Sequence, residues 1–122
     1  MYNSLSEIQD QLYHISAHIA SNGNDKYLKN VDYENKLESE IDQMDSLLPP
    51  LKNFIHPGGS IESSHLHVAR AISRRVERNY VAYSKNVPND VHMKFFNRLS
   101  DYLFICARYM NYINKTEDVV AK

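Results

Sequence analysis

Residues 60–85 read SIESSHLHVARAISRRVERNYVAYSK, a stretch without glycine or proline that decides the fold of this chain. Ser60 is a suitable helix N-cap, so the stretch predicts one long helix that runs to about Lys85. Apolar residues recur along it within a sector of about 60°, when each residue turns the helix by about 100°. We expect these residues to form the core stripe: Ala69, Ile72, Val76, Tyr80 and Tyr83.

A second sector of the same helix is charged. It is about 100° wide and carries Arg70, Arg74, Glu77 and Arg78. Arginines at successive i, i+4 positions repel one another unless a negative group lies among them. Glu77 supplies one such charge, and a phosphate or a partner carboxylate can supply the rest, because a guanidinium presents a planar donor fork to both. The face therefore indicates a site for an anionic, nucleotide-like ligand. A solvated or salt-bridged surface is the alternative.

Three further helices are predicted around this one. Ser4–Glu7 is a capping-box pattern that opens an amphipathic helix over Leu5–Ser21. Asp32 caps a second helix, which Pro49-Pro50 stops, and Asp90 caps the last, which reaches about Asn114. These lengths predict an all-α fold, a single domain over residues 1–122 built as an antiparallel four-helix bundle. We expect residues 116–122 to form a frayed, disordered tail.

Composition narrows the class of protein. The formal net charge of −1 argues against a nucleic-acid-binding polycation. No apolar run approaches the roughly 18 residues of a membrane span, and the first residues are unlike a signal peptide. Cys106 is the single cysteine, which suits a reducing cytoplasm, and we expect it to be an inert packing residue. His14 and His18 lie one helical turn apart, but no third ligand is evident, so we predict no metal site.

The last helix carries two polar residues on a largely apolar background. Asn97 and Asp101 are one turn apart, and an amide and a carboxylate among apolar residues need buried partners. The arginine face of the long helix, from the same or a neighbouring subunit, would provide them. Ordinary ion pairs between helices are the alternative.

Three blocks of sequence together resemble PduO-type ATP:cob(I)alamin adenosyltransferases: residues 51–60, residues 65–78 and residues 97–104. The resemblance implies a helical homotrimer with nucleotide sites at the subunit interfaces, which transfers the 5′-deoxyadenosyl group of ATP to the cobalt of a reduced corrinoid. It assigns ATP contacts to Arg74, Glu77, Arg78 and Asn97, with Asp101 supporting the arginines. It gives Arg75 an intersubunit ion pair and makes Phe54 the aromatic that keeps cobalt four-coordinate.

The chain also departs from the family pattern. The Thr-Gly-Asp-x-Gly loop that wraps the triphosphate, and the first helix with Asp-Glu-Leu-Asn, have no counterpart in these residues, so we expect a truncated form. His56 replaces the usual leucine on the corrin side, and Val76 replaces an alanine. Each lost backbone donor to phosphate is worth roughly 1.5–3 kcal/mol. Losing several should weaken triphosphate binding and its alignment for displacement.

Three functions follow from this pattern. The preferred one is a non-catalytic, nucleotide-binding homo-oligomer that sequesters a small nucleotide and needs no cofactor. The alternative is an ATP:cob(I)alamin adenosyltransferase that uses ATP, Mg²⁺ and cobalamin and draws triphosphate donors from Lys52, Lys85 or Lys94. The third is a structural bundle whose arginines only join subunits. In every case we expect no nucleic-acid or membrane partner.

Overall fold

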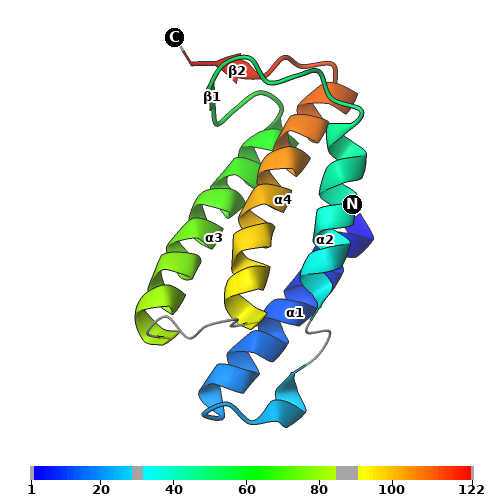
Figure 1. Ribbon diagram of the computed structural model, residues 1–122. Helices are drawn as coiled ribbons and strands as arrows, with labels where there is room; N and C mark the ends of the chain where they lie inside the picture. The colour runs from blue at the N-terminus through cyan, green and yellow to red at the C-terminus, as the bar shows by residue number, and fades with distance from the viewer. Residues whose placement is uncertain (1, 29–31, 85–90, 122) are drawn as a thin grey trace. The chain divides into compact units, whose positions relative to one another are not determined.

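The computed structural model describes residues 2–28, 32–84 and 91–121. Four helices carry most of the fold, and two short strands and one 3-10 turn join them (Figure 1). In chain order the elements are α1 (Tyr2–Ala20), η1 (Asp25–Tyr27), α2 (Tyr33–Asp45), β1 (Ile55–His56), α3 (Ile61–Ser84), α4 (Val91–Ile113) and β2 (Val119–Val120). The chain divides into two compact units, residues 1–33 and residues 34–122.

The first unit holds α1 and η1. Ile8 and Ile15 are buried, as the apolar spacing of this helix predicts. The helix ends in a Schellman motif, in which Asn22 adopts a left-handed conformation and the Gly23 amide donates to the His18 carbonyl at 2.8 Å. Each histidine of the candidate pair lies near a carboxylate: Nε2 of His14 is 3.6 Å from Asp10, and Nε2 of His18 is 3.5 Å from Asp25.

In the second unit α3 and α4 run antiparallel, side by side (Figure 1). Helix α4 supplies most of the core, and Tyr102 at its centre is completely buried. The Tyr102 hydroxyl donates to Glu40 of α2 at 3.5 Å, and Arg98 of α4 lies 3.9 Å from Glu38 of α2. The other buried apolar residues of α4 are Phe95, Phe96, Leu99, Leu103, Ile105, Cys106, Ala107 and Met110.

The buried face of α3 is not the expected one. Ile72, Val76 and Tyr83 are 47%, 39% and 60% exposed, so the predicted core stripe is wrong for these three residues. Ser63, His67 and Ser73 are buried instead. Small serine side chains permit α4 and its aromatic rings to approach this polar face closely. Of the predicted stripe, Ala69 is half-buried, and Tyr80 packs on the rings of His92 and Phe96, with centroids 5.8 and 5.4 Å away.

The segment 116–121 is ordered, which differs from the frayed tail expected from sequence. Its strand β2 pairs antiparallel with β1, with Val120 opposite Ile55 and Val119 opposite His56. The Ala121 amide donates to the Phe54 carbonyl at 2.7 Å. Pairing across more than 60 residues leaves no local trace in the sequence, which explains the difference.

Two expectations concern residues outside the described ranges: the cap at Asp90 and the role of Lys85. Among the helices that are described, none is long and apolar enough to cross a membrane.

Candidate functional site

The arginine face of α3 is largely open to solvent. Arg74, Arg75 and Arg78 are exposed, and Glu77 is half-buried. None of these four side chains forms an ion pair with a residue that the structure describes. The salt-bridged alternative is therefore not observed among the described residues. Unpaired guanidiniums one turn apart are a suitable receptor for a phosphate chain.

Arg70 belongs to the same sector but faces α4. Its guanidinium carbon lies 5.5 Å from the ring centre of Phe104, and its Nε is buried without a hydrogen-bond acceptor. The His67 ring meets the same phenyl ring edge-on at 6.2 Å, and neither nitrogen of His67 has a hydrogen-bond partner among the described residues. Burial, and then the neighbouring Arg70 charge, lower the pKa of His67. Arg70 therefore combines a packing role with its place on the charged face.

Asn97 and Asp101 lie on the exposed side of α4. Asp101 pairs with Arg98 of its own helix at 3.5 Å, and no contact with the α3 arginines is found among the described residues. The expected pairing within one subunit is therefore not observed. A pairing across a subunit interface stays a prediction.

Phe54 and His56 lie in the connection between α2 and α3. The Phe54 side chain is 87% exposed, and it borders a hollow of about 480 Å³ together with Leu51, Lys52, Asn53 and Ala121. His56 is exposed on β1. An exposed aromatic ring beside a wide hollow is suited to contact a large flat ligand.

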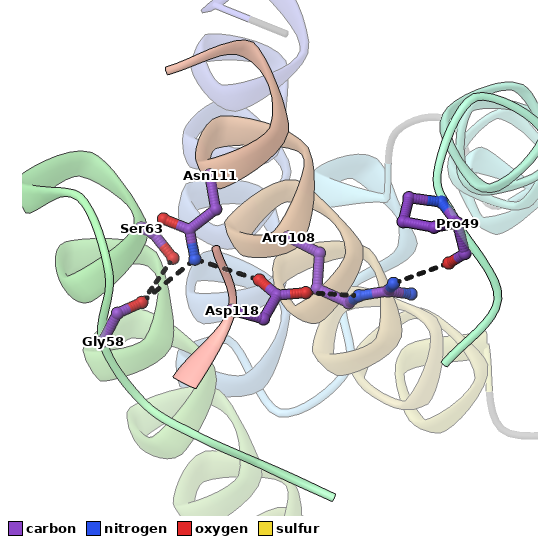
Figure 2. Close-up of polar contacts among 6 residues, drawn as sticks. All are labelled: Pro49, Gly58, Ser63, Arg108, Asn111 and Asp118. Carbon is purple, nitrogen blue, oxygen red and sulfur yellow. Dashed lines mark hydrogen bonds and ion pairs between the residues drawn. The ribbon is translucent and has the colours of Figure 1, made fainter. Parts of the chain in front are cut away.

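A buried polar network, which the sequence pattern did not predict, joins α4 to the connection between α2 and α3 (Figure 2). Nε of Arg108 donates to Asp118 at 3.1 Å, and its terminal nitrogen donates to the Pro49 carbonyl at 2.9 Å. Nδ2 of Asn111 donates to the other Asp118 oxygen at 3.0 Å and to the Gly58 carbonyl at 3.1 Å. The available signal was a pair of polar residues, Arg108 and Asn111, on the apolar side of the last helix.

Gly59 of the connection is required by the same network. Gly59 has a positive φ of 102°, and a Cβ there would collide with the Asn111 side chain. The side-chain Oδ1 of Asn111 accepts from the Ser60 amide at 2.8 Å, which joins the N-terminus of α3 to α4. Pro57-Gly-Gly59 is thus a structural turn and not a phosphate loop.

Cys106 is fully buried in α4, and burial raises the pKa of its thiol to about 12. A thiol in this state is neither a nucleophile nor a metal ligand at neutral pH. No cluster of three or more His, Cys, Asp or Glu side chains that could hold a metal occurs in the part of the chain that the structure describes.

The chain is similar to corrinoid adenosyltransferases throughout its length. Residues 1–110 match the cobalamin adenosyltransferase family. The corrinoid adenosyltransferase MMAB of Mus musculus is 42% identical over 113 residues, covering 86% of this chain and 48% of the relative. The corrinoid adenosyltransferase PduO of Citrobacter freundii is 36% identical over 124 residues, covering 97% of this chain and 37% of the relative. The chain therefore spans about half or less of the length of these curated relatives.

A solved structure agrees. A variant PduO-type ATP:corrinoid adenosyltransferase from Lactobacillus reuteri, complexed with cobalamin and ATP, superposes with a TM-score of 0.87 at 37% identity. The match covers 98% of this chain and 69% of that protein. The predicted all-α fold of four helices, like that of the adenosyltransferases, is confirmed. The preference for a non-catalytic, sequestering nucleotide binder is wrong, because relatives this similar are enzymes that act on corrinoids.

Proposed function

Because this chain belongs to the cobalamin adenosyltransferase family, we propose that it transfers the 5′-deoxyadenosyl group of ATP to the cobalt of a reduced corrinoid. The observation that carries the proposal is the Arg74–Arg78 face of α3, which has no ion pair among the described residues. A relative with the same fold has been solved with ATP and cobalamin bound. In the reaction, cob(I)alamin supplies an electron pair to C5′ of ATP. That pair forms the cobalt–carbon bond, the C5′–oxygen bond breaks, and triphosphate leaves with the electron pair of the broken bond.

The chain's contribution to the nucleotide is electrostatic. Arg74 and Arg78 would bind the triphosphate, whose negative charge rises at the leaving oxygen as the bond breaks. Glu77, between them on the same face, would orient the guanidiniums, and Asn97 would contact the nucleotide from α4. The described residues offer no metal cluster, so Mg²⁺ would arrive with the triphosphate of ATP and be held by it.

Phe54 would serve the corrinoid. Its exposed ring can occupy the lower axial side of cobalt, exclude a water ligand there and so keep the metal four-coordinate. A four-coordinate centre has no axial ligand to lose, which makes reduction to the cobalt(I) nucleophile easier. His56, which is also exposed, would lie on the same side.

The protein would act as a homotrimer. An exposed apolar stripe on α3, formed by Ile61, Val68, Ile72, Val76 and Tyr83, supports this proposal. Stripes of this kind are usual at subunit interfaces. Arg75 borders the stripe and would form an ion pair with the neighbouring subunit, and Asp101 would support the nucleotide-binding arginines. A cytoplasmic location stays a prediction that rests on the single buried cysteine.

The test is an anaerobic assay with chemically reduced cobalamin, ATP and magnesium. We expect the absorbance change of cobalt–carbon bond formation, and we expect Arg74→Ala to abolish it while the helical circular dichroism is unchanged. The exposed Lys26→Ala variant is the control for loss of a positive charge elsewhere. If the wild-type chain forms no adenosylcobalamin under these conditions, the enzymatic proposal fails.

A further inference from the structure

We propose that Asp118 is a positioning residue: through Arg108 and Asn111 it clamps the segment 116–121 onto the connection that carries Phe54, and so fixes Phe54 against the corrinoid. The proposal rests on the proposed function for its corrinoid. The clamp itself is a property of the fold and can be tested without turnover.

The position of the Phe54 ring depends on its backbone. The ring is 87% exposed, and it makes no ring contact or polar interaction with another described residue that would hold it in place. The backbone is held by the segment after α4: the Ala121 amide donates to the Phe54 carbonyl, and β2 pairs with the two residues that follow Phe54. The orientation of the ring therefore depends on the placement of β2.

The placement of β2 depends in turn on Asp118, the residue directly before it. Asp118 uses both carboxylate oxygens, one toward Arg108 and one toward Asn111 (Figure 2). Arg108 is only 5% exposed and Asn111 only 1%. Hydrogen bonds between a carboxylate and buried donors are the strong kind, and a buried guanidinium left without its carboxylate is costly. The strand therefore has one preferred position.

The same network secures the other end of the connection. The Gly58 carbonyl accepts from Nδ2 of Asn111 and from the hydroxyl of the buried Ser63, both at 3.1 Å. Arg108 also holds the Pro49 carbonyl, just after α2. Asp118 thus aligns Arg108 and Asn111, which bind the connection before and after Phe54. The effect of Asp118 on the corrinoid is exerted through these contacts, and it does not need to touch the ligand.

The experiment compares two variants with a matched control. Asp118→Asn keeps the size of the side chain and removes its charge, and Ala121→Pro removes the amide that donates to Phe54 and leaves the network intact. Glu117→Gln, an exposed neighbour without a hydrogen bond or ion pair, is the control. The readouts are hydrogen exchange of residues 54–59, the separate KM values for corrinoid and ATP, and the spectrum of bound cob(II)alamin.

Both variants should speed hydrogen exchange of residues 54–59. They should raise the KM for corrinoid about tenfold, which is the effect of losing one strong hydrogen bond, and change the KM for ATP less than twofold. The spectrum should show less four-coordinate cobalt. Glu117→Gln should match the wild type. Unchanged exchange and an unchanged corrinoid KM in Asp118→Asn would overturn the proposal, as would an equal rise in both KM values. If the wild type does not turn over, the proposed function fails by itself, and cobalamin affinity measured by absorbance replaces the KM.

Discussion

The guanidinium of Arg70 lies over the ring of Phe104 at 5.5 Å, whereas the next two arginines of the charged face, Arg74 and Arg78, extend from α3 without an acidic partner among the described residues. The three arginines of one helical sector thus lie in two different environments. Arg70 joins α3 to α4 by packing and a cation–π contact. Arg74 and Arg78 have no such contact among the described residues, and we propose that they bind a ligand.

This division predicts how alanine substitutions differ. Arg74→Ala and Arg78→Ala should each weaken ATP binding by about 1.5–3 kcal/mol, the value of a charge-assisted hydrogen bond, and leave the melting temperature unchanged. Arg70→Ala should lower stability by about 1 kcal/mol, because it removes a cation–π contact. Calorimetry with ATP and thermal unfolding measure the two effects. Wild-type ATP affinity in both Arg74→Ala and Arg78→Ala would return this face to a purely structural role.

Phe54→Ala separates function from stability. The ring is almost fully exposed, so its removal should change the free energy of unfolding by less than about 0.5 kcal/mol. Corrinoid turnover should nevertheless fall steeply, because nothing then excludes an axial water from cobalt. Tyr13→Ala removes another exposed aromatic ring, 68% exposed, and is the control. A Phe54→Ala variant with wild-type kinetics would remove Phe54 from the corrinoid site.

The buried His67 predicts that stability falls in mild acid. Its pKa lies below the ordinary value because of burial and Arg70, and Asp118 opposes this shift. The unfolded chain therefore takes up the proton first, so stability falls as the pH drops below about 6.5. His67→Gln should flatten the dependence of the melting temperature on pH between about pH 7 and pH 5. The exposed His65→Gln should not flatten it, and an identical slope in both variants would argue against the prediction.

The exposed apolar stripe of α3 predicts an oligomer that negative charges introduced into the stripe would dissociate. The double variant Ile72→Glu/Val76→Glu should convert the proposed oligomer to a monomer, because burying unpaired carboxylates at the interface carries a large desolvation penalty. Light scattering of the double variant measures the mass, and circular dichroism checks that the helices remain. Ala82→Glu, on an exposed position outside the stripe, is the control. An unchanged mass in the double variant would place the interface elsewhere.

Cys106 should report global unfolding. With its thiol pKa near 12, the folded protein holds almost no thiolate at pH 8, and the side chain is buried, so a thiol reagent should react only when the chain opens. In the unfolded chain the pKa of this thiol is about 8.5. The contribution of the neutral thiol to the stability of the fold is therefore complete below about pH 8.5 and is lost as the pH rises toward 12. Reaction rates with and without denaturant measure this. Rapid labelling of the native protein would contradict it.

Local rules in the sequence located the helices well. The expected Leu5–Ser21 helix corresponds to Tyr2–Ala20, and the Ser60 cap correctly precedes a helix over Ile61–Ser84. Capping residues and apolar spacing act within a few residues, so they can be read from sequence.

The features that the sequence did not predict depend on contacts between distant segments. Hydrophobic spacing shows which face of α3 is apolar, but not which face meets α4. Ser63 and His67 are buried because the neighbouring helix accommodates them, and only the fold reveals this. The candidate ligand face of Arg74 and Arg78 was visible in the sequence, whereas the Asp118 network was not, because its partners lie up to 59 residues apart.

The clamp also has a consequence for how the chain folds. Helices α3 and α4 are neighbours in sequence and can pair early, whereas the contacts of Asn111 with Gly58 and Ser60 close loops of 53 and 51 residues. Because closing such long loops costs conformational entropy, the contacts that hold the Phe54 connection should form after the main folding barrier has been crossed. Asp118→Asn should then accelerate unfolding and leave the folding rate almost unchanged, which corresponds to a φ-value near zero.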